Sequence, residues 1–513
     1  MPRFYIENFG CRATQADGAA LERQFLDRGL ERASVARDAE IVVLNTCTVT
    51  EGADKDARAS IRRLQRVNPD CQILVTGCYA QRAPEELAVL PGVTWVVGNS
   101  HKHRAAEIAT ASSFRAHSFP SNSGFVPLGQ LSQPQISQAQ SKEGQSKEAQ
   151  SGNVFVGDIF AHTELLAAPV FEAANERTRP NLKVQDGCNN RCSFCVIPYV
   201  RGKSRSLPLD RVLAEVRTLV ASGYREVVIS GINLGRWGRD LDRVDGRSLV
   251  DGGLGSFGSA AKSQRLAPDP DRPATTDQRL VPLIRAILEQ TSLEKLRISS
   301  VEPMDWSDEL IALMSTSPRI AKHAHVPLQS ASDAVLRRMR RKYRPWHYRE
   351  KILSIRAAMP TAAIGADVMV GFPGETEAEF NETQRMIEEL PFTYLHVFTY
   401  SPRPGTPAAE QFSQVPVEVA RERNRVLREI ASKKKTKFMR SLTTTTIEAI
   451  TLHSGGADFT EALTDNYLKM KIFGRYEANH WLKVNVDAVD GEMLVGHSVT
   501  PWSCGAGTLA RCS

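Results

Sequence analysis

The sequence predicts an α/β protein with three folded parts: a doubly wound parallel sheet, an open (βα)6 barrel and a small C-terminal β-barrel. Strand and helix signals alternate over residues 1–110 and again over residues 179–414. Short strand signals without intervening helices then follow over residues 441–503. Alternating strands and helices build parallel sheets, whereas short strands separated by turns build sandwiches or barrels.

The composition is that of an ordinary globular protein. The 513 residues carry 65 Lys and Arg against 58 Asp and Glu, a net charge of +7 that permits nucleic-acid binding without requiring it. Apolar runs are too short for a membrane span, and residues 1–4 lead into a strand signal instead of a signal peptide. We therefore expect a cytoplasmic protein with no membrane contact, whose nine cysteines serve metal binding or catalysis and not disulfides.

The first part, residues 1–110, alternates apolar or β-branched runs with helical apolar spacing. The predicted strands are 4–7, 41–45, 72–76 and 94–97, and the predicted helices are 15–28, 52–67 and 84–89. Cys11, Cys47 and Cys78 each follow one of the first three strands. Carboxyl ends of parallel strands share one edge of the sheet, so these thiols should converge on a common metal site. A single buried cysteine is more often a small hydrophobic residue, and we expect Cys71, which precedes its strand, to be either structural or merely exposed.

Residues 111–178 form a predicted linker. More than half of the positions between 130 and 152 are Gln or Ser. Such a segment buries too little apolar surface to offset its ordering entropy, so we expect disorder.

Six strand–helix units follow over residues 179–414, which favours an open barrel because the closed form needs eight. The predicted strands are 182–185, 226–230, 295–299, 323–328, 364–370 and 394–400. The predicted helices are 208–222, 279–291, 307–315, 332–341 with a continuation after Pro345, and 375–389. A Gly-, Asp- and Ser-rich stretch at 236–277 lacks periodicity and is expected to be a surface insertion.

The remaining chain begins with a basic helix, residues 415–440, whose charges are either a solvated face or an RNA contact. The expected β-barrel strands are 445–450, 468–473, 482–489 and 492–497. Cys504 and Cys512 lie in a tail that we expect to be frayed.

Three more cysteines lie in one loop after the first barrel strand. Cys188, Cys192 and Cys195 have the spacing C-x3-C-x2-C. Thiolates select zinc, copper(I) or iron–sulfur clusters, and a structural zinc normally takes four ligands, of which this loop offers three. The loop favours a cluster with one open iron, with a zinc knuckle as the alternative.

These motifs together resemble the methylthiotransferase family of radical S-adenosylmethionine (SAM) enzymes over nearly the whole chain, apart from the two insertions. The N-terminal cysteine motifs are residues 10–12, 45–50 and 77–81, and the radical SAM signature covers 185–202 and 205–206. Residues 47–50, 231–235, 296–303, 325–330 and 400–406 are similar to the branch that acts on threonylcarbamoyladenosine at position 37 of tRNA. The terminal β-barrel resembles an RNA-binding TRAM domain. Thr14 departs from the family, which usually has Asn there.

The resemblance implies two [4Fe–4S] clusters, each with one open iron, and SAM as cofactor. Cys188, Cys192 and Cys195 would hold the cluster that cleaves SAM, and the resulting 5′-deoxyadenosyl radical would attack the adenine C2–H. Cys11, Cys47 and Cys78 would hold a second cluster that carries the inserted sulfur. The implied partners are tRNA and an electron donor such as flavodoxin or ferredoxin.

Five further residues are candidates for SAM contact: Phe194, Gly231, Asn233, Ser300 and Glu302. The alternatives are a core aromatic for Phe194 and a tight turn for Gly231 and Asn233. Arg201 and Arg205 could pair with the SAM carboxylate or with tRNA phosphate, and residues 371–375 could frame SAM or start a helix. Other possible functions are methylthiolation of isopentenyladenosine or of a ribosomal-protein aspartate, and a non-catalytic metal-containing RNA-binding protein.

Overall fold

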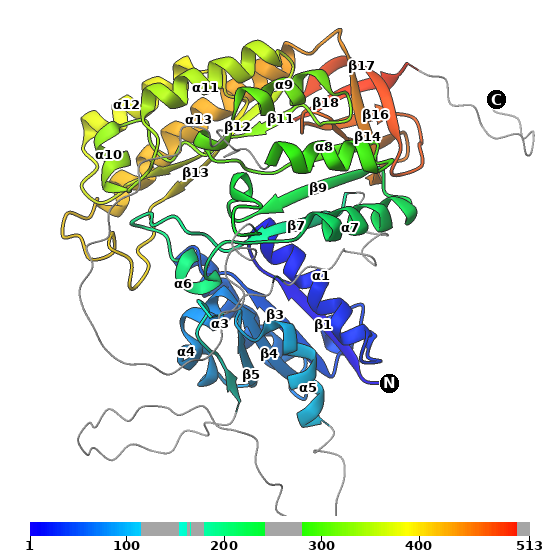
Figure 1. The fold of residues 1–513 in the computed structure, drawn as a ribbon, viewed down its shortest axis with the longest axis vertical. Helices are drawn as coiled ribbons and strands as arrows, with labels where there is room; N and C mark the ends of the chain where they lie inside the picture. The colour runs from blue at the N-terminus through cyan, green and yellow to red at the C-terminus, as the bar shows by residue number, and fades with distance from the viewer. Residues whose placement is uncertain (114–152, 162–164, 166–178, 242–279, 500–513) are drawn as a thin grey trace, which may run out of the picture.

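The computed structural model describes residues 1–113, 153–161, 165, 179–241 and 280–499 (Figure 1). The N-terminal part is a parallel sheet with the strand order β2-β1-β3-β4-β5-β6. Its strands are β1 (Arg3–Asn8), β2 (Glu31–Arg32), β3 (Ile41–Thr46), β4 (Gln72–Gly77), β5 (Val93–Gly98) and β6 (Val154–Phe155). The four predicted strands are confirmed, and the two short edge strands β2 and β6 were not anticipated.

Helices cover both faces of this sheet, as a doubly wound fold requires. They are α1 (Arg12–Leu26), α2 (Glu51–Val67), α3 (Cys78–Arg82), α4 (Pro84–Ala88) and α5 (Ala105–Ser113). One apolar layer packs α2 against alternate residues of β3 and β4, and the opposite layer packs α1 and α5 against the other face. The predicted linker 111–178 needs a correction: it contributes the end of α5 and the edge strand β6, and most of the rest lies outside the described residues.

The six predicted barrel strands are confirmed and run parallel to their neighbours. They are β7 (Asn181–Asp186), β9 (Glu226–Gly231), β10 (Lys295–Ile298), β11 (His323–His325), β12 (Ala363–Val370) and β13 (Tyr394–Thr399). A short strand, β8 (Arg205–Ser206), adds antiparallel to β7. The orders β10-β9-β7-β8 and β11-β12-β13 are joined by an isolated bridge between Leu296 and Ile320. β11 ends three residues earlier than predicted, two residues before Pro327, which has no N–H to donate to a strand ladder.

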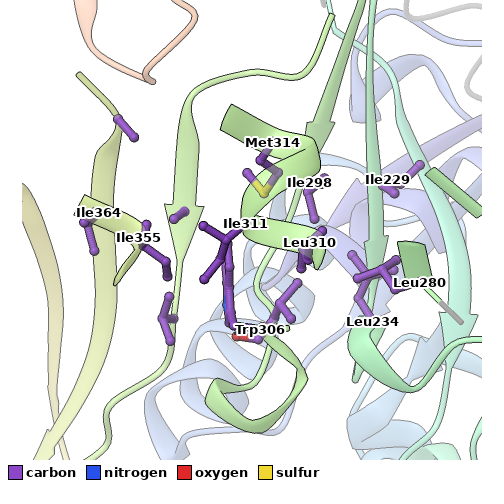
Figure 2. Packing of buried hydrophobic residues seen from close by; sticks show 14 of the residues in the cluster. Ile229, Leu234, Leu280, Ile298, Trp306, Leu310, Ile311, Met314, Ile355 and Ile364 are labelled. Atoms are coloured by element: carbon purple, nitrogen blue, oxygen red, sulfur yellow. Dashed lines mark hydrogen bonds between the residues drawn. The ribbon is translucent and has the colours of Figure 1, made fainter. Parts of the chain in front are cut away.

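The barrel helices lie outside the strands. They are α7 (Leu209–Ala221), α8 (Leu280–Gln290), α9 (Asp308–Thr316), α10 (Asp333–Arg338), α11 (Pro345–Ala358) and α12 (Glu377–Glu389). The short helix α6 (Ile197–Arg201) lies instead beside α3 of the N-terminal part (Figure 1). Figure 2 shows the apolar layer between strands and helices, in which Ile229, Ile298 and Ile364 of the strands face residues of α8, α9 and α11. This packing fixes the strands whose carboxyl ends carry the cysteine loop.

The insertion predicted at 236–277 begins later than expected. The indole of Trp237 is buried and donates to the Leu207 carbonyl at 3.0 Å. Asp240 accepts from the Ser206 amide at 2.8 Å and from its hydroxyl at 2.6 Å. Residues 237–241 are therefore part of the barrel, and residues 242–279 lie outside the described part of the chain.

The basic helix is confirmed as α13 (Val417–Arg440), and it leads into a closed barrel of order β14-β15-β16-β18-β17. The strands are β14 (Thr446–Gly455), β15 (Phe459–Thr464), β16 (Lys469–Phe473), β17 (Trp481–Asp490) and β18 (Met493–Ser498). β15 was not predicted, and the cysteine tail lies outside the described residues. Within the described ranges, no helix has the length and apolar character to cross a membrane.

Candidate active site

Cys11, Cys47 and Cys78 follow three neighbouring strands of the N-terminal sheet, β1, β3 and β4. Two glycines allow the cysteine-bearing turns to approach each other. A Cβ on Gly10, whose φ is +101°, would lie 2.5 Å from the Cβ of Cys47, and a Cβ on Gly77 would lie 2.3 Å from the Thr46 carbonyl oxygen. The predicted convergence of the three cysteines at one sheet edge thus depends on backbone positions that exclude a side chain.

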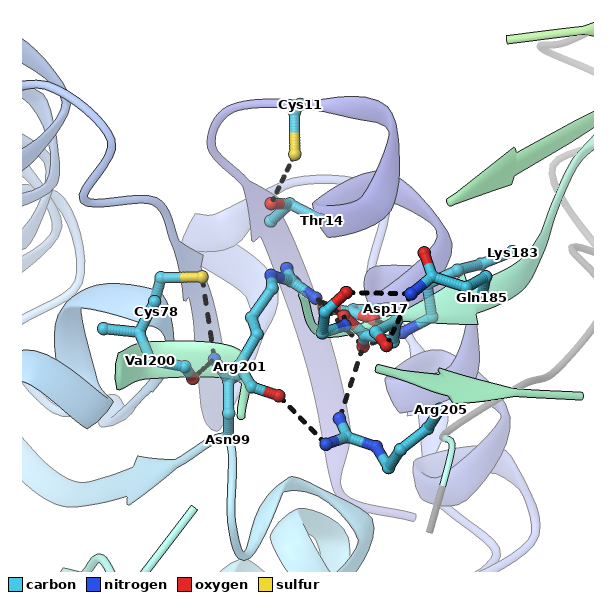
Figure 3. A network of polar contacts seen from close by, with 12 residues as sticks. Cys11, Thr14, Asp17, Cys78, Asn99, Lys183, Gln185, Val200, Arg201 and Arg205 are labelled. Carbon is cyan, nitrogen blue, oxygen red and sulfur yellow. Dashed lines mark hydrogen bonds and ion pairs between the residues drawn. The ribbon is translucent and has the colours of Figure 1, made fainter. Parts of the chain in front are cut away.

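The three thiols of this N-terminal group influence one another electrostatically. Burial raises the pKa of Cys47 to about 12, and the negative charges of Cys78 and Cys11 add to the shift. Cys47 and Cys78 are buried and Cys11 is exposed, and a cation or a metal cluster is needed to hold the three side by side as thiolates. Two side chains can donate to the sulfur atoms: the Asn99 amide lies 3.6 Å from Cys78 Sγ, and the Thr14 hydroxyl lies 3.6 Å from Cys11 Sγ (Figure 3).

The second group of cysteines lies in the loop between β7 and α6. Gly187, with φ of +71°, begins the loop, and a Cβ there would lie 2.0 Å from the Lys203 carbonyl oxygen. Cys188 accepts from the Asn190 amide at 3.4 Å and from the Asn233 side chain at 3.7 Å. Burial raises the pKa of Cys195 to about 12, with the charge of Cys192 as the next cause.

The spacing of the thiols favours clusters over zinc. Tetrahedral zinc with Zn–S bonds of about 2.3 Å holds its sulfurs roughly 4 Å apart. Among the described residues, neither cysteine group has all three sulfurs within 4.8 Å of one another. A four-iron cluster binds each thiolate at a different iron, so wider spacing fits it, and the N–H donors found at both sites are the kind that tune cluster sulfurs.

Arg341 is a site residue that the sequence did not indicate. It is buried in the turn after α10, and its guanidinium donates to Cys192 Sγ at 3.4 Å. It also forms an ion pair with Glu302, a predicted SAM contact. Glu302 is therefore engaged by a protein cation, and the pair lies directly beside the cysteine loop.

The other predicted SAM contacts are at the carboxyl edge of the barrel, and each has a protein partner. A Cβ on Gly231 would lie 2.8 Å from Gln185 Oε1, which accepts from the Asn233 amide at 2.7 Å. The Ser300 hydroxyl lies 2.5 Å from His325 Nδ1. The Phe194 ring meets Phe372 edge-on with centroids 6.4 Å apart. Their assignment as SAM contacts therefore remains a prediction.

A buried ion network, which the sequence patterns did not predict, joins the two cysteine sites. Asp17, in the helix that follows Cys11, lies 3.0 Å from Lys102 Nζ and 3.0 Å from the Arg201 guanidinium, and it also pairs with Lys183. Asp186, two residues before Cys188, pairs with Lys183 at 2.8 Å and with Arg201 at 3.0 Å. Figure 3 shows this network between the N-terminal sheet and the first barrel strand.

The network carries three cations against two carboxylates, so its charge is positive where it faces the thiols. The cations around Asp17 hold its pKa well below the usual range against the opposing effect of burial. The charges of Asp186, Cys78, Asp17 and Cys11 raise the pKa of Arg201 against its burial. Three thiolates beside this network carry negative charge, and the surplus of buried positive charge favours an anionic occupant such as a thiolate-bound metal cluster.

The expectation that Arg201 contacts SAM or tRNA phosphate was wrong. Its side chain is 2% exposed and is paired with Asp17 and Asp186. Arg205 donates to the Arg201 carbonyl at 2.9 Å and lines a cavity of about 980 Å³ beside the cysteine loop. Lys203, Arg211 and Lys342 also line this cavity, whose basic wall fits an anionic ligand.

Arg403 forms a second connection between the two parts, from the loop after β13. It pairs with Asp54 of α2 at 2.7 Å and donates to the Thr48 carbonyl at 3.2 Å. Thr48 follows Cys47, one of the predicted cluster ligands. The segment 371–375, predicted either to frame SAM or to start a helix, leads into α12, which begins after the N-cap Thr376, two residues later than predicted. Its Glu375 binds Arg423 of α13 at 2.9 Å.

Two family matches correspond to the N-terminal sheet and to the barrel. Residues 3–98 match the family described as "Uncharacterized protein family UPF0004", and residues 182–387 match the radical SAM superfamily.

Three relatives show the likeness over most of the chain. A threonylcarbamoyladenosine tRNA methylthiotransferase, MtaB, from Bacillus subtilis is 34% identical over 82% of this chain and 78% of its own. The MtaB of Aquifex aeolicus is 32% identical over 93% and 98%. A tRNA-2-methylthio-N(6)-dimethylallyladenosine synthase from Thermobifida fusca is 32% identical over 83% and 73%.

Proposed function

The chain belongs to the radical SAM methylthiotransferase family of the MtaB type, and from this premise we propose how its residues carry the reaction. It is a tRNA-modifying enzyme that uses SAM and two [4Fe–4S] clusters to add a methylthio group to N6-threonylcarbamoyladenosine. We assign the modified atom as C2 of the adenine at position 37.

The observation that carries this proposal is the pairing of two three-cysteine edges across one buried ion network. Cys188, Cys192 and Cys195 hold the cluster of the barrel, and Cys11, Cys47 and Cys78 hold that of the N-terminal sheet. When bound, the clusters and SAM supply the adenosyl radical and the sulfur. The protein's own contribution is position, because Asp17 and Arg201 fix the two edges relative to each other, and Arg403 fixes the Cys47 turn to the barrel.

Several polar groups of the protein prepare the radical site. The guanidinium of Arg341 and the side chain of Asn233 donate to cysteine sulfurs, which stabilises thiolates in this partly buried loop. We infer that Phe194, Gly231, Asn233, Ser300 and Glu302 surround SAM at this edge. The ion pair between Glu302 and Arg341 then determines the local electrostatic environment of bound SAM.

We assign tRNA binding to two basic surfaces. One is the cavity beside the cysteine loop with Lys203, Arg211 and Lys342. The other is a groove of about 500 Å³ between α13 and the terminal barrel, lined by Arg428, Lys435 and Lys469. Cations beside partly buried aromatic rings such as Tyr467 suit single-stranded RNA. The electron donor is a flavodoxin- or ferredoxin-type protein, and the place of action is the cytoplasm.

The test is the nucleoside composition of tRNA from a strain that lacks this gene. The 2-methylthio derivative of threonylcarbamoyladenosine should disappear, return with the wild-type gene, and stay absent with Cys188→Ala. Its persistence in a strain with no second such enzyme contradicts the assignment.

A second candidate substrate is dimethylallyladenosine in tRNA, favoured by the Thermobifida relative, whose identity of 32% is close to the 34% of the first MtaB. The same nucleoside profile separates the two, because only one of the two methylthio nucleosides should vanish. Loss of a modified ribosomal-protein aspartate would instead indicate the third possibility.

A further inference from the structure

A group of metal-ligating side chains without any cysteine lies inside the barrel. His325 at the end of β11, Asp367 on β12 and His396 on β13 place one ligand atom each within 4.8 Å of the others. Across the described ranges, no other set of three or more His, Cys, Asp or Glu side chains comes this close together. The methylthiotransferase reaction derived above gives none of the three a role.

The strand register explains why these three side chains meet. Asp367 is directly paired with His396, and His325 is paired with Gly365, two residues before Asp367. Residues two apart in a strand share a face, and neighbouring strands lie about 4.8 Å apart. The three ligands therefore occupy one face of three adjacent strands.

His325 is held in the orientation of a ligand. Its Nδ1 lies 2.5 Å from the Ser300 hydroxyl, and its ring stacks on Tyr394 with centroids 6.0 Å apart and planes 14° apart. The residue is 7% exposed, and its Nε2 is buried without a hydrogen-bond partner, 3.5 Å from Asp367 Oδ1. A histidine that binds a metal through one ring nitrogen commonly has the other nitrogen fixed by a hydrogen bond of this kind.

We propose that His325, Asp367 and His396 bind one divalent transition-metal ion, such as Zn²⁺ or Fe²⁺. Two imidazoles and one carboxylate are a ligand set that these ions take in proteins. With its proton on Nδ1 and donated to Ser300, His325 offers the lone pair of Nε2 to the ion. His396 is exposed and lines the 500 Å³ groove beside α13, which gives the ion an entry path and leaves coordination positions for water.

The competing arrangement is a simple ion pair between a protonated His325 and Asp367. That arrangement retains no metal and does not involve His396. The two arrangements therefore differ in metal content and in the effect of changing His396.

The experiment measures zinc and iron by mass spectrometry in the full chain with both clusters loaded, after equilibration with Zn²⁺ and removal of loosely bound ion by a weak chelator. Wild type should retain about one zinc per chain more than His325→Gln, Asp367→Asn or His396→Gln, while all four proteins keep the same iron. The matched control is His453→Gln, an exposed histidine on β14, which should retain zinc like wild type. Equal zinc in wild type and in the three ligand variants would overturn the proposal.

A second measurement distinguishes loss of the metal site from misfolding of a variant. Zn²⁺ should raise the unfolding temperature of wild type and of His453→Gln, because an ion that binds only the folded state stabilises it. His396 is exposed, so His396→Gln should fold normally and show no such rise. A rise of the same size in His396→Gln would also overturn the proposal.

Discussion

At the scale of single residues, the site depends on which cysteines carry a cluster and which do not. Cys78 and Cys71 are both buried, yet Cys78 follows strand β4 at the edge to which we assign the cluster, and Cys71 precedes β4 at the opposite edge. Burial raises the pKa of Cys71, as expected of an inert structural thiol. Position relative to the strand therefore separates ligand from core residue where burial does not.

Iron content should report this difference. Wild type should hold about eight irons, and Cys188→Ala and Cys78→Ala should each lose about half of them, because the two clusters are separate. Cys71→Ala should keep all of the iron. The measurement is iron per chain after anaerobic reconstitution, together with 5′-deoxyadenosine formation, which should stop in Cys188→Ala and continue in Cys78→Ala. Loss of iron in Cys71→Ala would contradict the assignment.

We expect the Asp17 carboxylate to contribute strongly to the unfolding free energy. Asp17→Asn leaves Lys102, Lys183 and Arg201 short of a buried partner, and breaking such a pair costs about 3–5 kcal/mol of unfolding free energy. Asp27→Asn, at the exposed end of the same helix, should change it by less than about 0.5 kcal/mol. Urea unfolding of the two variants checks this, and equal midpoints would refute it.

The same carboxyl predicts a pH dependence. Because the pKa of Asp17 is lower in the folded than in the unfolded protein, its contribution is present above the unfolded value of about 4. That contribution is lost as the pH falls from there toward the folded value. The difference in unfolding free energy between wild type and Asp17→Asn should therefore shrink on acidification below about pH 4. A constant difference would show that Asp17 acts through packing and not through charge.

At the scale of elements, the turns that follow the strands contain the candidate site residues, and glycines allow the backbone conformations of these turns. Gly187 begins the barrel cysteine loop with φ of +71° and has a carbonyl oxygen where its Cβ would be. Gly223 has a similar φ of +90° but has no heavy atom within 4 Å of that position. Alanine substitutions at Gly187 and Gly223 therefore separate the cost of backbone strain from the cost of a steric collision.

Gly223→Ala should cost about 1–2 kcal/mol from strain alone and leave the iron unchanged. Gly187→Ala should cost more, since the Lys203 backbone must move, and should lose up to half of the iron because the loop shifts. Unfolding midpoints and iron content measure both effects. The same iron loss in both variants would mean that collision has no part in it.

Much of this element scale was predictable from sequence. The strands ending before Cys11, Cys47 and Cys78 follow from apolar runs, and parallel topology brings their ends to one edge of the N-terminal sheet, while the strand before Cys188 ends at the edge of the separate barrel sheet. The pairing of Asp17 with Arg201 could not be predicted, because it joins a helix of one part to a short helix of another, 184 residues apart, and buried charges carry no periodic signal. Because buried charges carry no periodic signal, the sequence suggested Arg201 as a ligand contact. Strand β15 was not predicted because its alternation of apolar and polar residues is weak.

At the scale of the whole molecule, the two sheet edges act together only if their relative position is fixed. The Asp17 network fixes one side of the interface, and Arg403, bound to Asp54 and Thr48, fixes the other. Each proposed cluster site takes its three cysteines from one part of the chain. Loosening the interface should therefore spare SAM cleavage and impair sulfur insertion.

Arg403→Met tests this separation. Arg82 remains 3.1 Å from Asp54 and keeps that carboxylate paired, so folding should survive. Product formation should fall by roughly 10- to 100-fold, because small misplacements of reacting groups have effects of that order, while 5′-deoxyadenosine formation should be retained. Arg285→Met, which removes an exposed ion pair with Glu309, is the control. An equal fall of both products would show that Arg403 does not act through the interface.

The most direct test of the account follows the nucleosides of threonylcarbamoyladenosine-containing tRNA incubated with the reconstituted protein, SAM and a reductant. Wild type should form both 5′-deoxyadenosine and the 2-methylthio nucleoside, whereas Cys78→Ala should form 5′-deoxyadenosine and leave the tRNA unmodified. Absence of the methylthio nucleoside with both clusters loaded, or its formation by Cys78→Ala, would contradict the claim that two cluster sites share this reaction.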